Sequence, residues 1–216
     1  MPTITKITEQ KRRANRRSVF LNGSFAFGCN INVIAKFRLV EGAKLSDEQV
    51  LAIQQGEVRQ ECFDKAIKFI ERRMHSRSEL KQKLTRYECG PTVIESVLDQ
   101  LEELGYVNDK KFAEAKAESA AKYKHHGPNR ARMELAKKGV GRETARRAVE
   151  TVYESHDSAA MARDLAEKKA RSLRKLEPHI AKRRLVGMLL RRGFDYDTIK
   201  PVIAEVLGNT DEHVAD

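Results

Sequence analysis

The sequence contains no tryptophan, and aromatic residues make up only 6% of its 216 residues. Aromatic residues favour strands, so this shortage argues for a mainly helical protein and against a β-sandwich. Cys29, Cys62 and Cys89 are odd in number and scattered, which indicates free thiols in a reducing, cytoplasmic setting. The chain has no run of 18 apolar residues and no segment like a signal peptide, so we expect neither a membrane span nor secretion.

Motifs for catalysis and for cofactor binding are missing as well. The sequence has no CxxC pair, no HExxH, no GxSxG and no GxxxxGKS/T phosphate-binding loop. Its six histidines are not spaced as metal ligands, and its carboxylates are dispersed among lysines and arginines, as on solvated helix faces. We therefore expect a binding protein that is not an enzyme and that uses no metal or cofactor.

Positive charge, in contrast, is abundant: the formal net charge is +11. Residues 110–156 carry 12 basic and 6 acidic side chains, and residues 157–207 carry 12 and 7. The first 17 residues are also basic, whereas residues 208–216 carry three acidic side chains and no basic one. This distribution indicates a polyanionic partner such as DNA, or an acidic protein surface. The alternative is a basic surface that serves only solubility.

The N-terminal quarter of the chain differs from the rest. Residues 1–17 are expected to form a basic, poorly ordered arm. Residues 18–28 predict a hairpin, because two strand-prone runs flank Asn22-Gly23, a dipeptide that suits a tight turn. Residues 30–40 fit a helix or a strand. Ser46 to Gln49 then form a capping box that predicts the start of a short helix.

An internal repeat dominates the remainder of the chain. Residues 82–98 align without gaps with residues 133–149 at an offset of 51, and the latter align with residues 187–203 at an offset of 54. Matching apolar positions recur with the spacing of one buried helix face. They include Leu84, Leu135 and Leu189 on one helix, and Val97, Ala148 and Val202 on the next.

Helix-start signals recur with the same period. The second helix of each unit is preceded by Ser76 to Glu79, by Gly127-Pro128 or by Glu177-Pro178, and the last unit has four extra residues there. The third helices begin at Gly90-Pro91, Gly141 and Asp195, and Asp109 is expected to cap a first helix. First helices are predicted over 58–74, 110–125 and 157–175.

These signals predict a mainly α protein built from three tandem three-helix repeats. Stacked repeats of this kind would form an elongated, curved body. The expected segments are the flexible arm (1–17), a β-hairpin with a short helix (18–57), the three repeats (58–109, 110–156 and 157–208) and an acidic tail (209–216).

The repeat residues resemble a known family. SRSELKQKL (76–84), VIESVLDQLEELGYVNDKKFAEA (93–115) and GPNRARMELAKKGV (127–140) are similar to segments of the RecX proteins, which modulate the RecA recombinase. NGSFAFG (22–28) resembles the N-terminal region of longer members. The resemblance covers nearly the whole chain. It implies a protein that lies in the groove of the RecA–DNA filament and inhibits filament growth, ATP turnover or strand exchange in recombination and SOS repair.

Basic residues of the second and third repeats are the candidate contacts with RecA or DNA. In stacked repeats they would line up as a stripe that contacts DNA phosphates or acidic recombinase surfaces. The set comprises Arg130, Arg132, Lys137, Lys138, Arg142, Arg146, Arg147, Lys182, Arg183, Arg184, Arg191 and Arg192.

Two functions compete for this stripe. The first is regulation of a RecA filament by a monomeric, cytoplasmic protein that also contacts single- and double-stranded DNA without sequence preference. The second is a DNA-binding module with helix-turn-helix character that acts on DNA directly. Tyr106, Phe112 and Tyr123 lie near the junction of the first two repeats; they could stack on a base, but packing between helices is the favoured interpretation.

Overall fold

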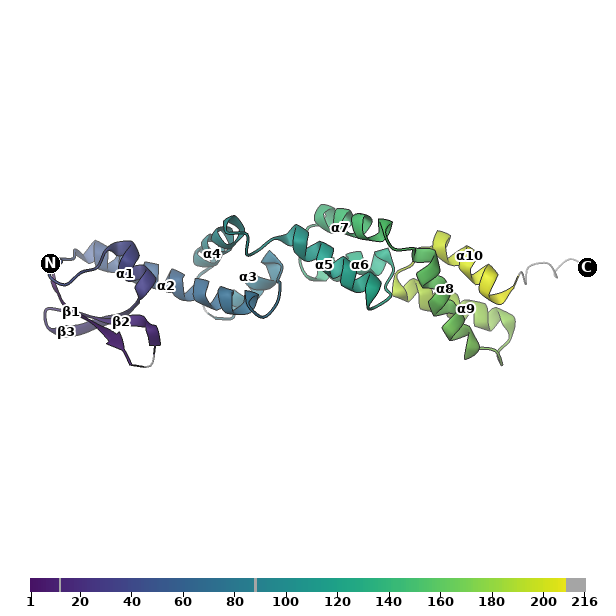
Figure 1. The fold of residues 1–216 in the computed structure, drawn as a ribbon, viewed down its shortest axis with the longest axis horizontal. Helices are drawn as coiled ribbons and strands as arrows, with labels where there is room; N and C mark the ends of the chain where they lie inside the picture. The colour runs from purple at the N-terminus through teal and green to yellow at the C-terminus, as the bar shows by residue number, and fades with distance from the viewer. Residues whose placement is uncertain (12, 88, 209–216) are drawn as a thin grey trace, which may run out of the picture. The chain divides into compact units, whose positions relative to one another are not determined.

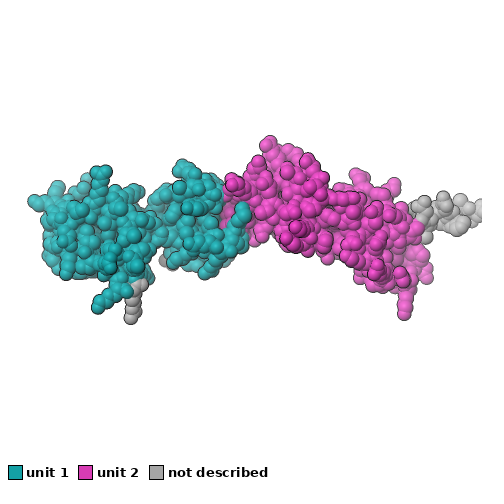
Figure 2. All heavy atoms as spheres, in the orientation of Figure 1, with its two compact units in different colours: residues 1–74, 80–107 teal, residues 75–79, 108–216 magenta. Residues whose placement is uncertain are grey.

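The computed structural model describes residues 1–11, 13–87 and 89–208. These residues contain ten helices and three strands (Figure 1). They form two compact units, coloured separately in Figure 2. Unit 1 comprises residues 1–74 and 80–107, and unit 2 comprises residues 75–79 and 108–216. The start of the second helix of repeat one therefore belongs to unit 2.

The N-terminus forms a three-stranded antiparallel sheet of β1 (Ile4–Gln10), β2 (Arg13–Leu21) and β3 (Ser24–Asn30), in that order. The flexible arm predicted over residues 1–17 is therefore wrong. Burial explains the difference, because Ile4 is fully buried in the same core as Val19, while Thr5 and Lys6 on the same strand are exposed. The predicted hairpin is present: Asn22 and Gly23, at φ of 50° and 85°, connect β2 to β3.

Two helices follow the sheet. The ambiguous segment after β3 forms α1 (Ile31–Phe37), and the capping box at Ser46 opens α2 (Asp47–Ile70), as predicted. The sequence predicted two separate helices over the range of α2, but one continuous helix of 24 residues is present. Gly56 does not interrupt it. A Cβ there would lie 2.7 Å from Cε2 of Phe37, so the glycine allows the close approach of α1.

Three helical repeats make up the remainder, as predicted. Repeat one contains the second half of α2, α3 (Arg77–Thr85) and α4 (Pro91–Glu103). Repeat two contains α5 (Asp109–Lys122), α6 (Pro128–Lys137) and α7 (Arg142–Glu154). Repeat three contains α8 (Ser158–Arg171), α9 (Pro178–Arg192) and α10 (Tyr196–Leu207).

The aligned apolar positions are the cores of these repeats. Leu84, Leu135 and Leu189 are all buried, each in the hydrophobic cluster of its own repeat. α9 has 15 residues against 10 in α6, because the four extra residues of repeat three extend its start and the helix ends one residue later. Four residues are about one helical turn, so the insertion leaves the buried face in register.

In unit 2, the second helices of successive repeats meet end to end. The start of α6 contacts the end of α9: the amide N of Gly127 donates to the carbonyl of Arg192 at 2.9 Å, and the amide N of Asn129 to the carbonyl of Gly193 at 3.0 Å. The start of α3 makes the equivalent contact with the end of α6, where the Ser76 hydroxyl donates to the carbonyl of Lys138 at 2.5 Å.

Each of these junctions is built on a left-handed glycine. Gly139 and Gly193 have φ of 70° and 92°, and in both cases the helix closes with a hydrogen bond from the residue after the glycine to a buried leucine carbonyl. A Cβ on Gly193 would lie 2.3 Å from the amide N of Arg130. The repeat offset of 54 relates the two glycines, so the sequence repeat and the junction share one period.

The link between repeats one and two contains a further correction. Asp109 was predicted to cap α5, but Asn108 does so, accepting from the amide N of Lys111 at 3.0 Å. Asp109 instead accepts from the amide N of Arg77 at 2.8 Å. The first amides of a helix lack partners within it, so the carboxylate of Asp109 serves the start of α3.

Asp195 caps α10 as predicted, and its effect on stability is testable. Its carboxylate accepts from the amide N of Thr198 at 2.7 Å, and this backbone hydrogen bond lowers the pKa of Asp195. Asp195→Ala is expected to lower the free energy of unfolding by about 1 kcal/mol at pH 7, and Asp195→Asn by less, because asparagine keeps the acceptor.

The pH dependence of that effect follows from the lowered pKa. A carboxylate with a depressed folded-state pKa stabilises the protein above its unfolded value of about 4, and this contribution is lost as the pH falls through the folded value. Urea unfolding followed by circular dichroism at several pH values measures it. If the difference between wild type and Asp195→Asn is the same at pH 7 and well below pH 4, the assignment is wrong.

Candidate partner-binding surface

The twelve basic residues predicted to contact the partner all lie in unit 2. They belong to α6 with its C-terminal cap, to α7 and to α9. The structure divides them by what surrounds their side chains, and only some of them share a face.

The basic residues of α7 are largely neutralised by the same helix. The Arg146 guanidinium donates to Glu143 and to Glu150, each at 2.7 Å, and Arg147 also donates to Glu143 at 2.7 Å. The hydrogen bond that Glu143 accepts from Arg146, and then the one from Arg147, lower the pKa of Glu143 to about 2. Because α7 contains three basic and three acidic residues, its surface carries no net charge. Arg142 is exposed at the start of this helix.

Three other basic residues are bonded within the protein, two of them to neighbouring segments and one within its own helix. Lys138 Nζ lies 2.7 Å from the carboxylate of Glu79, whose side chain is only 10% exposed. Arg192 donates to the carbonyl of Lys124 at 2.9 Å, and Arg132 donates to Asn129 at 2.6 Å. Lys138 and Arg192 occupy equivalent positions at the ends of α6 and α9. Their contacts show that this pair supports the repeat junctions.

Four of the remaining cations of α6 and α9 lie on the side of their own helix that is opposite its buried leucine, and we call these matched positions the second-helix face. Its residues follow the i, i+3, i+7 spacing of a helix surface, opposite the buried Leu135 and Leu189. The face consists of Arg130, Met133 and Lys137 on α6, and of Arg184, Gly187 and Arg191 on α9. The two sets are related by the repeat offset of 54, so cations recur at matched positions.

The α9 part of this face has the highest charge. α9 contains five basic residues and no acidic one, with Lys182 and Arg183 exposed beside Arg184. Gly187 leaves the middle of the face without a side chain, and its Cβ position lies 3.3 Å from Nη1 of Arg191, whose guanidinium folds back over the gap. On α6, Glu134 moderates the charge, since it pairs with Lys124 at 2.9 Å and lies 3.7 Å from Arg130.

Sequence reasoning missed Met133 and Gly187, although both stand at matched positions of the repeat and the offset of 54 could have revealed them. It was also wrong about two aromatic residues. Phe112 is buried, as expected for packing between helices, but Tyr106 and Tyr123 are 57% and 72% exposed. Tyr123 stands at the C-terminal cap of α5, where Lys122 lies over its ring at 5.6 Å.

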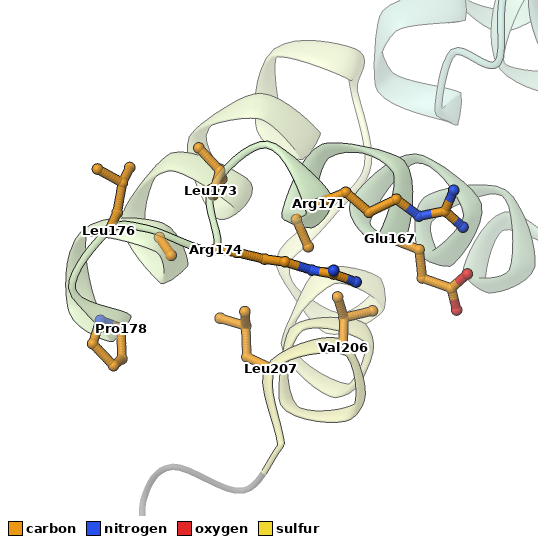
Figure 3. Close-up of a pocket in the computed structure, with 10 residues that line it drawn as sticks. Glu167, Arg171, Leu173, Arg174, Leu176, Pro178, Val206 and Leu207 are labelled. Carbon is orange, nitrogen blue, oxygen red and sulfur yellow. The ribbon is translucent and has the colours of Figure 1, made fainter.

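Repeat three also contains a hollow of about 430 Å³ between the end of α8, the start of α9 and the end of α10 (Figure 3). Leu173, Leu176 and Leu207 supply apolar walls, and the side chain of Arg174 extends across the opening. Among the described residues that line it, Glu167 is the one carboxylate.

Within the residues that the structure describes, no three histidine, cysteine, aspartate or glutamate side chains gather in a way that could hold a metal ion. In the same residues, no helix is both long enough and apolar enough to span a bilayer.

The fold and the second-helix face together define a class: a tandem three-helix-repeat protein with a basic surface along its second helices. Four family models match the chain. They describe the regulatory protein RecX N-terminal domain (residues 2–46) and the first, second and third RecX three-helix domains (62–101, 108–149 and 157–203). The chain belongs to the RecX family of regulatory proteins, which is not a family of enzymes.

Individual relatives agree with this assignment. The regulatory protein RecX of Bacillus subtilis strain 168 is 32% identical over 98% of this chain and 80% of its own length. That of Listeria monocytogenes is 29% identical over 96% of this chain and 77% of its own length. A crystal structure of regulatory protein RecX matches 94% of this chain and 98% of its own with a TM-score of 0.82 at 24% identity. RecX from Lactobacillus salivarius matches 70% of this chain and 97% of its own, with a TM-score of 0.63 at 23% identity.

Proposed function

We propose that this protein binds the RecA–DNA filament and inhibits RecA ATPase activity, filament extension and strand exchange in recombination and SOS repair. It acts in the cytoplasm as a monomer and without catalysis of its own. The observation that carries the proposal is the second-helix face, where Arg130 and Lys137 on α6 recur as Arg184 and Arg191 on α9.

A filament repeats the same subunit along its length, so a protein with cations at a fixed interval can contact it at several places. Each cation adds a modest, salt-dependent interaction with a phosphate or an acidic side chain. Once the first contact has formed, the further contacts are effectively intramolecular. The total affinity is therefore well above that of any single contact. This argument holds whether DNA phosphates or acidic RecA residues supply the negative charge.

The alternative is a module that binds single- or double-stranded DNA directly. The five basic residues of α9, uninterrupted by an acid, favour it. A helix-turn-helix reader, however, places its recognition helix in the major groove. The third helices would have that role, yet α4 contains four acidic residues and no basic one, and α7 has no net charge. Direct DNA binding would therefore be independent of sequence and sensitive to salt.

The test is the rate of ATP hydrolysis by RecA on single-stranded DNA as this protein is added, at low and at moderate salt. We expect inhibition at well below one molecule per RecA, persisting at moderate salt, because specific contacts with the filament do not depend on exposed charges alone. If added DNA relieves the inhibition in proportion to its amount, the protein only competes for the polyanion and direct DNA binding replaces the filament proposal.

A further inference from the structure

Among the described residues of unit 1, the helices pack on one face of the N-terminal sheet and leave the other without a helix. Its inner face contributes Ile4, Val19 and Cys29 to a core shared with α1 and α2, and both helices lie on that side of the sheet (Figure 1). Strand pairing places Lys6, Phe20 and Phe25 in one row across the outer face. The next row consists of Thr8, Ser18 and Gly28.

Two aromatic rings stand on this outer face. The rings of Phe20 and Phe25 are 5.9 Å apart and nearly perpendicular, at 79°. Such a cross-strand pair stabilises a hairpin, but it leaves Phe25 60% exposed. An aromatic side chain so exposed on a sheet, beside small polar residues, offers a flat apolar surface to a ligand.

The charge of this region indicates that a ligand of the outer face would be negatively charged. The first 30 residues contain six basic side chains and one acidic one. Arg16 is bound to Glu57 at 2.7 Å and Arg17 to Glu9 at 2.7 Å, so neither is available. Lys6, Lys11 and Arg13 are exposed and have no ion pair among the described residues. Lys6 stands directly opposite Phe20, which combines a cation with the aromatic pair.

We propose that the outer face of this sheet binds single-stranded nucleic acid, with unpaired bases stacked on Phe25 and Phe20 and the adjacent phosphate on Lys6. Stacking on aromatic side chains tolerates any base but requires that the base be unpaired, so duplex DNA is excluded from this site. The second-helix face carries cations without an aromatic pair and belongs to unit 2, whereas the sheet belongs to unit 1. The two sites are independent, and the sheet site does not rest on the RecA proposal.

The absence of tryptophan makes a direct test possible. Phe25→Trp introduces one indole into a chain that has none, at a position with room for it. We expect an oligothymidylate of about ten nucleotides to quench its fluorescence, because a stacked base quenches an indole. A strand of equal length whose residues lack bases is expected to bind more weakly and to leave the emission unchanged. An oligouridylate tests whether DNA or RNA is preferred.

A matched variant separates stacking from binding elsewhere. Val40, in the turn after α1, is also 60% exposed, and Val40→Trp is expected to keep its emission in the presence of the oligonucleotide. Phe25→Leu keeps the apolar bulk and removes the ring, so the affinity of this site is expected to fall about tenfold. Lys6→Gln is expected to reduce the slope of log affinity against log salt by about one.

Several outcomes would overturn the proposal. They are unchanged emission of folded Phe25→Trp at saturating oligothymidylate, equal quenching by the strand without bases, or equal quenching by duplex DNA. Quenching only when another protein is added would assign the face to a protein partner. No recombinase enters this experiment, so its failure leaves the filament proposal untouched, and a failed ATPase test leaves this one untouched.

Discussion

Gly193→Ala is expected to reduce the free energy of unfolding of this protein by about 3 kcal/mol or more. The backbone of Gly193 is in the left-handed region, at φ of 92°, which costs an alanine about 1 kcal/mol by itself. The added Cβ would also lie 2.3 Å from the amide N of Arg130 and 2.4 Å from its Cβ, so the start of α6 has to move away from the end of α9.

Gly105→Ala is the control for this substitution. Gly105 also follows a helix with a left-handed backbone, at φ of 74°, but has no atom within 4 Å of its Cβ position. It is therefore expected to show the backbone cost alone, about 1 kcal/mol. Urea unfolding of both variants by circular dichroism compares them. Equal losses for Gly193→Ala and Gly105→Ala would mean that the contact between α6 and α9 contributes little.

Reversal of charge on the second-helix face is expected to weaken inhibition of RecA strongly. A variant with Lys137→Glu, Arg184→Glu and Arg191→Glu replaces three recurring cations with repulsive groups, and the concentration needed for half-maximal inhibition is expected to rise on the order of 100-fold. Lys137, Arg184 and Arg191 are exposed and make no ion pair in the part of the chain described, so the fold is expected to survive.

A second triple variant tests whether position or total charge matters. Lys110→Glu, Lys111→Glu and Lys169→Glu change the net charge equally, on exposed positions of α5 and α8 away from the face. This variant is expected to retain most of the inhibition, with a modest loss from weaker long-range attraction. If both variants lose inhibition equally, overall charge governs binding and the second-helix face is not a specific site.

The repeats could be predicted from the sequence because equivalent positions are buried in each of them. Leu84, Leu135 and Leu189 have the same environment in each repeat, and capping residues such as Asp195 act within one turn of the chain. The first strands could not be predicted in the same way. β2 carries Arg13, Arg16 and Arg17, so its composition resembles that of an unstructured arm, and only the fold shows that Arg16 pairs with Glu57 and Arg17 with Glu9.

For the candidate surface, the sequence identified the basic residues, but it could not show which of them are free to bind a partner. The contacts between Arg146 and Glu143 lie three residues apart on one helix and follow from helical spacing. The pairing of Lys138 with Glu79 spans 59 residues, and only the fold brings the two together. Whether a cation is free for a partner thus depends on tertiary contacts that leave no local signal.

The end-to-end junction of α6 with α9 is formed by main-chain hydrogen bonds and a closely packed glycine, and among side chains Arg192 supports it. Mutation can therefore alter nearly every exposed residue of these helices without changing the interval at which successive repeats present them. The backbone and the glycines at the junctions fix the interval between successive repeats, whereas the side chains exposed at that interval can vary. A substitution of an exposed side chain would then change the strength of binding to a partner. A substitution at Gly193 would instead change the relative position of the binding side chains on α6 and α9.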